Sequence, residues 1–285
     1  MSAPWPNGFE SETDATPELT ADLATYYQSQ IGVLHWIVEL GRVDIIAEVS
    51  MLVSQMALPR EGHLEAVFFV FAYLKCHHNA RNVFDPTYYE IDESKFLPND
   101  WKNFYGDVKE AIPTNAPEPR GKEVVLRLYT DSDHAGEKRT RRSRTGYFVF
   151  LNSALIAWLS KKQPNIETSV FGAEFVALKT GLEAVRGIRY KLRMMGVPLD
   201  SPTYTYVDNM SVVHNTQRPE STLNKKSNSI CYHFARECVA AGEALMGHVP
   251  TNENPADLAT KILCSGQKRK GLVGMLLHDI HDNDS

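Results

Sequence analysis

The chain has 285 residues, of which 43% are hydrophobic, so it is long enough for one large domain or two smaller ones with real cores. Its net charge of −5 is uneven: residues 1–119 hold 7 basic and 18 acidic residues, and residues 120–285 hold 23 and 17. The second part therefore has a weak preference for anionic partners. No apolar run approaches the roughly 20 residues that span a bilayer. The four scattered cysteines argue against a disulfide scaffold and favour a reduced compartment.

The first part of the chain predicts helices. Residues 1–20 are polar and acidic, which predicts a disordered lead-in. Apolar residues recur at helical spacing from Ile45 to Met56, stop at Pro59, and resume over residues 63–76. We therefore expect a small helical region over residues 21–111. A proline-rich segment then places a domain boundary near residues 112–121.

Beyond residue 121 the pattern changes to strands and helices. Apolar and β-branched runs predict five strands, at residues 123–131, 145–152, 154–160, 203–209 and 244–250. A long amphipathic helix is expected from about Ser169 to Met195, with shorter helices near 210–216, 228–241 and after Asn254. This order predicts an α/β fold with a five-stranded mixed sheet flanked by helices.

Acidic residues stand where this pattern would bury them. Asp131 and Asp208 each end a predicted strand, and Glu174 lies with the apolar stripe of the long helix. Such acids repel one another unless a cation neutralises them. Oxygen ligands select Mg²⁺, with Mn²⁺ as the alternative, and two such ions suit in-line hydrolysis of a phosphodiester. Asp257 is a further candidate, although an acid in the first turn of a helix also suits the helix dipole.

Six sequence blocks together resemble a known family. They are, in order, YTDSDHAG, RRSRTGYFVFLNSALIAWLSKKQP, GAEFVAL, YVDNMSVV, YHFARE and HVPTNENPADLATK. Over residues 121–265 the chain resembles the ribonuclease H (RNase H) domain at the C-terminus of Ty1/copia-type retrotransposon polyproteins. Residues 21–111 resemble the thumb or connection segment of the preceding reverse transcriptase, and residues 266–285 would form a C-terminal tail.

The resemblance implies an RNase H-like fold and a site that binds two Mg²⁺ ions. It implies that Asp131, Glu174, Asp208 and Asp257 are the catalytic residues and metal ligands. The expected activity is cleavage of the RNA strand of RNA–DNA hybrids during reverse transcription. The expected partners are the hybrid and the polymerase portion of the polyprotein, with no membrane. The expected location is a cytoplasmic retroelement particle, with the nucleus as the alternative.

Basic residues near the predicted site have two interpretations. They either form a solvated hairpin tip and strand end, or they contact nucleic-acid phosphates beside the acids. Asn209, next to Asp208, is a further candidate for contact with the hybrid. The candidate nucleic-acid-binding residues are Arg141, Arg142, Arg144, Lys161, Lys162 and Asn209.

Two other functions remain open from the sequence. The chain would be a catalytically idle connection or hybrid-binding module if it came from a truncated element. It would cut duplex DNA if it were an integrase or another nuclease on the same fold. A zinc site is not favoured, because the spacing of Cys231, His233, Cys238 and His248 fits no common zinc pattern.

Overall fold

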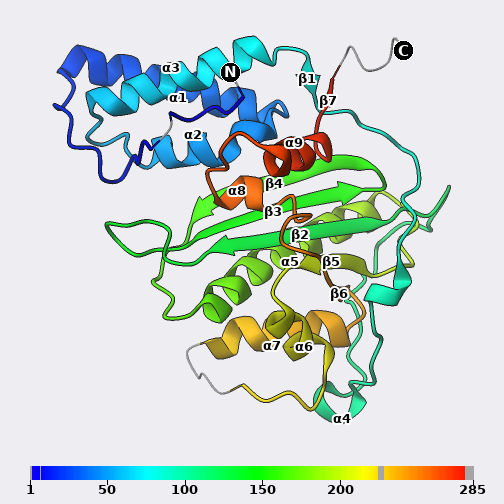
Figure 1. The fold of residues 1–285 in the computed structure, drawn as a ribbon. Helices are drawn as coiled ribbons and strands as arrows, with labels where there is room; N and C mark the ends of the chain where they lie inside the picture. Colours follow the sequence, from blue (N-terminus) through cyan, green and yellow to red (C-terminus); the bar gives the residue numbers. More distant parts are fainter. Residues whose placement is uncertain (1, 7, 224–227, 280–285) are drawn as a thin grey trace.

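The structure, a computed structural model, describes residues 2–6, 8–223 and 228–279. One five-stranded sheet forms its centre (Figure 1). Its strands are β2 (Leu126–Asp133), β3 (Arg144–Leu151), β4 (Ala154–Lys162), β5 (Thr203–Val207) and β6 (Ala244–His248). Their order across the sheet is β4-β3-β2-β5-β6. Strand β3 is antiparallel to β2 and β4, whereas β5 is parallel to β2 and β6. The predicted α/β fold with a five-stranded mixed sheet is confirmed.

Helices cover both faces of this sheet because successive side chains of a strand point to opposite faces. Leu128 of β2 belongs to the same apolar core as Phe175 of α5 (Val170–Met194), whereas the neighbouring Tyr129 belongs to a second core together with Leu258 of α8 (Asp257–Thr260). Helices α6 (Met210–Gln217) and α7 (Ser229–Ala240) lie on the α5 side. Each fully buried leucine or phenylalanine in these layers contributes about 1.5–3 kcal/mol.

The N-terminal helices stack over the α8 face of the sheet (Figure 1). They are α1 (Ala21–Glu39), α2 (Ile46–Val53) and α3 (Glu61–Cys76). Buried residues of these helices, such as Leu34 and Val49, belong to the same apolar core as Phe148 of β3. The hydroxyl of Ser50 also donates to the carbonyl of Ser160 at 2.8 Å, which ties α2 to β4. The helical region and the sheet therefore share one core. The domain boundary near residues 112–121 stays a prediction.

Shorter elements connect these layers. They are two 3-10 helices, Val43–Ile45 and Glu93–Lys95, helix α4 (Lys102–Tyr105), and helix α9 (Gln267–Gly274). Two short strands, β1 (Ala80–Arg81) and β7 (His278–Asp279), pair antiparallel. This pairing joins the C-terminal part of the chain to the end of α3.

The structure differs from the sequence prediction at the N-terminus. Residues 1–20 are predicted to be disordered, yet Trp5 is buried and its indole N–H donates to the carbonyl of Phe9 at 2.8 Å. Arg60, which precedes α3, donates to the carbonyl of Thr16 at 2.6 Å. The acidic composition predicted disorder, but contacts such as these hold the segment against the start of α3.

The predicted C-terminal tail is also part of the packed structure. Leu272 of α9 is 1% exposed and lies in the same core as the N-terminal helices. Arg269 is buried and forms an ion pair with Glu48 of α2 at 3.3 Å. Residues 280–285 of the predicted tail lie outside the described residues. The correction matters because α9 comes close to the acidic residues described below.

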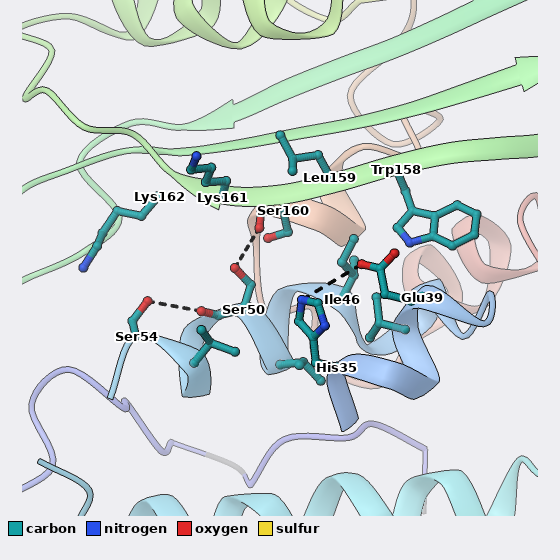
Figure 2. Close-up of a pocket in the computed structure, with 13 residues that line it drawn as sticks. His35, Glu39, Ile46, Ser50, Ser54, Trp158, Leu159, Ser160, Lys161 and Lys162 are labelled. Carbon is teal, nitrogen blue, oxygen red and sulfur yellow. Dashed lines mark hydrogen bonds and ion pairs between the residues drawn. The ribbon is translucent and has the colours of Figure 1, made fainter. Parts of the chain in front are cut away.

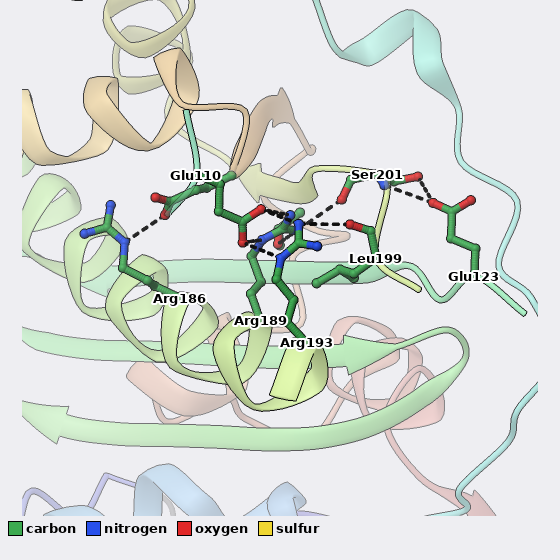
Figure 3. A network of polar contacts seen from close by, with 9 residues as sticks. Glu110, Glu123, Arg186, Arg189, Arg193, Leu199 and Ser201 are labelled. Carbon is green, nitrogen blue, oxygen red and sulfur yellow. Dashed lines mark hydrogen bonds and ion pairs between the residues drawn. The ribbon is translucent and has the colours of Figure 1, made fainter. Parts of the chain in front are cut away.

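The C-terminal end of α5 is fixed by an acidic residue of the preceding linker (Figure 3). Both carboxylate oxygens of Glu110 accept from Arg189, at 2.8 and 2.7 Å, and both also accept from Arg193. Burial opposes the charge of Glu110, but the two guanidinium groups outweigh it and lower its pKa to about 2. Glu110 therefore attaches the linker to α5 as a partner that is charged at neutral pH.

Candidate metal centre

Three aspartates from different parts of the chain meet at one edge of the sheet. Asp131 lies near the end of β2, Asp208 follows β5 directly, and Asp257 is the first residue of α8. Because β2 and β5 are parallel neighbours, their carboxyl ends lie side by side. One carboxylate oxygen from each aspartate lies within 4.8 Å of those of the other two. This separation is short enough for one or two divalent ions to bridge the three side chains.

Glu174 approaches the same edge from α5. The hydroxyl of Ser169 accepts from the backbone N–H of Gly172, which caps α5 and sets Glu174 just past its first turn. Glu174 is buried, and it lines an open pocket of about 570 Å³ together with Asp208. Within the described part of the chain, its Oε2 atom has no hydrogen-bond partner. A buried carboxylate oxygen without a partner is costly, so this oxygen suits a cation or a hydrogen-bond donor as a ligand.

The electrostatics of this cluster favour an added positive charge. Burial raises the pKa of Asp131 to about 6, and Asp257 and Asp208 contribute to the rise. Burial also raises the pKa of Glu174 well above its usual range, with Asp131 and Asp208 adding to the effect. Each shift means that the ionised carboxylate is disfavoured in the protein without metal. Divalent cations would remove that penalty, so these residues fit a metal centre.

Two lysines contact the cluster, and sequence reasoning missed both. Lys261 donates to Oδ1 of Asp257 and lies 3.2 Å from Oδ2 of Asp131. Lys268, from α9, donates to the other oxygen of Asp257. Burial opposes the charge of Lys261, but Asp131 and Asp257 outweigh it and raise its pKa. The contact of Lys261 with Asp257 could have been predicted from the sequence, because residues four apart on a helix lie on the same face. The contact of Lys268 could not have been predicted, because it depends on where α9 packs.

Polar side chains hold Asp131 and Asp257 in place. The hydroxyl of Thr260 donates to Oδ2 of Asp131. The side chain of Asn254, which is fully buried, donates to the carbonyl of Thr130 at 3.0 Å and accepts from the backbone N–H of Ala256 at 3.1 Å. These bonds tie the turn before α8 to the end of β2. They explain how a helix of only four residues presents Asp257 beside Asp131.

The predicted nucleic-acid-binding residues do not behave alike. Arg141 and Lys161 are exposed near the acidic edge of the sheet, and Arg142 is partly exposed. Lys162 forms an ion pair with Glu137 at 3.1 Å. Asn209 caps α6 by accepting from the backbone N–H of Ser211 at 3.0 Å. The structure therefore leaves Arg141 and Lys161 as the freest of these residues for contact with phosphates.

Arg144 differs most from its predicted surroundings. Its side chain is 4% exposed and donates to the hydroxyl of Ser50 in α2. The same Ser50 lines a pocket of about 330 Å³ between the N-terminal helices and β4, which also exposes Lys161 and Lys162 (Figure 2). The packing of α2 over the sheet covers Arg144, which the run of basic residues in the sequence did not reveal. A phosphate would reach Arg144 only if this contact opened.

No family model matches the chain. The retrovirus-related Pol polyprotein from transposon RE1 of Arabidopsis thaliana is 28% identical over 239 residues, which cover 84% of this chain and 14% of the relative. The corresponding polyprotein from transposon TNT 1-94 of Nicotiana tabacum is 27% identical over 253 residues, or 87% of this chain and 16% of the relative. The predicted resemblance to retrotransposon polyproteins is confirmed. The chain spans about a seventh of the length of these relatives.

A solved structure with a similar fold is that of LC11-RNase H1 in complex with an RNA/DNA hybrid. It is 18% identical, covers 47% of this chain and 93% of its own, and has a TM-score of 0.39. Within the described residues, no helix combines the length and the apolar character needed to cross a membrane.

Proposed function

We propose that the chain is an RNase H-type endonuclease that uses divalent ions, Mg²⁺ or Mn²⁺, to cleave the RNA strand of RNA–DNA hybrids. The observation that carries this proposal is the convergence of Asp131, Asp208 and Asp257, whose carboxylate oxygens lie within 4.8 Å of one another. Glu174 supplies a fourth acid at the same pocket. The resemblance to retrotransposon polyproteins supports the same function, because the six sequence blocks that carry it contain all four acids.

Each acid has a separate part in the proposed reaction. Asp131 and Asp257, held by Thr260 and Asn254, would be the fixed ligands. Asp208 and Glu174 border the open pocket and would face the scissile phosphate. When bound, two divalent ions would activate a water molecule and stabilise the leaving oxygen. Protons compete with divalent ions for these carboxylates, so the affinity for the metal should fall as the pH drops below the raised pKa of metal-free Asp131, about 6.

The proposed substrate is an RNA–DNA hybrid, read mainly by its shape and by the 2′-hydroxyl groups of the RNA strand. Exposed cations support binding of its phosphates: Arg141 follows β2 in the connecting loop, and Lys161 lies at the end of β4. Register places that end of β4 next to the start of β3 and the end of β2. The cations and the acids thus lie along one edge of the sheet, where one duplex can contact both.

We also propose that the polymerase portion of a reverse transcriptase polyprotein is a partner. The relatives are Pol polyproteins of which this chain matches a small part. Helix α1 and the residue that caps its C-terminus expose apolar side chains, Trp36 at 64% and Leu40 at 68%, which suits a packing surface. In that context the proposed location is a cytoplasmic retroelement particle, with the nucleus as the alternative.

Cleavage of a labelled RNA–DNA hybrid in Mg²⁺ tests the proposed function. The wild-type protein should cut the RNA strand, EDTA should stop the reaction, and Asp208→Asn should lose it while still binding the hybrid. Binding without cleavage by the wild type would instead identify a catalytically idle hybrid-binding module. Cutting of duplex DNA in the same assay would favour the third function, another nuclease on this fold.

A further inference from the structure

The two lysines in the acidic cluster affect how a divalent ion can reach Asp257. Both oxygens of the Asp257 carboxylate are occupied in this structure, Oδ1 by Lys261 and Oδ2 by Lys268. Asp257 has no exposed surface, so neither oxygen is available to a solvent ion in this conformation. A divalent ion that binds Asp257 therefore competes with the two ammonium groups for the same carboxylate.

We propose that Lys268 is a built-in counter-ion that stabilises the metal-free cluster and competes with divalent ions for Asp257. This inference rests on the proposed function, because it takes the cluster to be a metal site. Lys261 shares the role, but it also bridges to Asp131 and is the residue that directly follows α8. Lys268 comes from α9 and contacts Asp257 from outside that helix.

The surroundings of Lys268 allow such an exchange. Its neighbour Arg269 is buried and held by Glu48, and Leu272 is buried in the core, so α9 stays in place. The side chain of Lys268 itself is 38% exposed. A lysine is a flexible point charge on a four-carbon stem, so it can turn into solvent without moving its helix. An incoming ion can therefore displace the ammonium group while the backbone stays fixed.

The charge balance of the cluster predicts how removing Lys268 changes stability and metal affinity. The four acids of the cluster carry more negative charge than the two lysines neutralise, and Asp131 and Asp208 add to the rise that burial causes in the pKa of Glu174. Removing Lys268 leaves Asp257 with one cation fewer. The metal-free protein should then be less stable, and the site should attract a divalent ion more strongly. The two effects have opposite signs, which separates competition from simple damage to the fold.

The test compares Lys268→Met with Lys270→Met, which removes the same charge from an exposed position of the same helix. Binding of Mn²⁺ is measured by calorimetry, and thermal melting is measured in EDTA and in saturating Mn²⁺. We expect Lys268→Met to bind Mn²⁺ about fivefold more tightly than the control, as the loss of a partly exposed ion pair predicts. It should melt below the control in EDTA and close to it in Mn²⁺.

Equal Mn²⁺ affinity in the two variants, or weaker binding by Lys268→Met, would overturn the inference. A lower melting temperature of Lys268→Met that persists in saturating Mn²⁺ would also overturn it, because it would indicate a purely structural role. If the wild type and both variants bind no Mn²⁺, the proposed function fails first, and the competition fails with it. Melting in EDTA still reports in that case whether Lys268 stabilises the cluster.

Discussion

Helix α5 has an acidic side chain near each of its ends, the partly buried Glu110 and its own buried Glu174, and their surroundings shift the two pKa values in opposite directions. Near the C-terminal end, Glu110 is enclosed by Arg189 and Arg193 (Figure 3). Near the N-terminal end, Glu174 faces other acids. Burial penalises the charge of both. At Glu110 the arginines overcome that penalty and lower the pKa to about 2, whereas at Glu174 the acids add to it and raise the pKa.

This difference separates a structural ion pair from a candidate functional site. An acid with fixed cation partners is satisfied by the fold, and its charge stabilises the folded protein. An acid buried among acids has no favourable partner until an added cation binds. Its burial destabilises the fold, so its presence indicates a functional role. The number of buried charges does not distinguish the two ends of α5. The direction of the pKa shift does.

The largest expected effect comes from neutralising the unsatisfied acid. Glu174→Gln should lower the rate of hybrid cleavage by roughly 10³-fold or more, because the stabilisation that bound ions give the transition state is several kcal/mol. The metal-free protein should keep or slightly raise its melting temperature, since a buried amide needs no counter-ion. Single-turnover cleavage in Mg²⁺ and melting in EDTA measure the two effects.

The matched control for this variant is Glu183→Gln, on the same helix, where the acid is 49% exposed and pairs with Lys179. It should change neither the cleavage rate nor the melting temperature appreciably. Cleavage by Glu174→Gln at the wild-type rate would contradict the assignment of Glu174 to the metal centre. A large loss of stability in EDTA would contradict its description as an unsatisfied acid.

Much of this arrangement could be predicted from the sequence, because it depends on local patterns. Strand patterns ended at Asp131 and Asp208, and a general rule places the ends of parallel strands together. Helical periodicity placed Glu174 on the side of its helix that faces the sheet. The six resembling blocks then connected these acids with Asp257. These residues were found because their positions follow from the element in which each one lies.

Other features could not be predicted, because they depend on contacts between distant segments. Arg144 and Arg141 belong to the same basic run, yet α2 covers only Arg144. Lys268 reaches Asp257 because α9 packs on the N-terminal helices, and no pattern in residues 266–285 predicted a helix there. Trp5 anchors a segment whose composition alone predicted disorder. In each case the deciding partner lies far away in the sequence.

A smaller effect is expected from the satisfied acid. Glu110→Gln should lower the free energy of unfolding by on the order of 3 kcal/mol at neutral pH, because the folded protein holds this carboxyl at a pKa of about 2 instead of 4.5. Because the pKa of Glu110 is lower in the folded than in the unfolded protein, its charge stabilises the fold at pH values above the unfolded pKa. The difference between wild type and variant should therefore shrink as the pH falls from about 4.5 towards about 2.

Urea denaturation at several pH values between about 7 and about 3 measures this difference, and cleavage at neutral pH should survive in Glu110→Gln. Glu118→Gln is the control, because Glu118 is an exposed acid of the same linker. A stability gap that stays constant as the pH falls would show that Glu110 acts through packing and not through its charge. A loss of cleavage without a loss of stability would place Glu110 in the reaction, contrary to the comparison.

The smallest expected effect is on hybrid binding, and it distinguishes an exposed arginine, Arg141, from a buried one, Arg144. Arg141 is exposed, so Arg141→Gln should weaken hybrid binding by a few-fold and reduce the salt dependence of binding by about one phosphate contact. Arg144→Gln should leave the salt dependence unchanged and lower stability instead, because its guanidinium is buried against Ser50. Binding titrations at several salt concentrations, with melting curves for both variants, measure the two effects. An equal reduction of the salt dependence by Arg144→Gln would mean that α2 uncovers Arg144 when the hybrid binds. Burial in the free protein would then not show which arginines have a purely structural role.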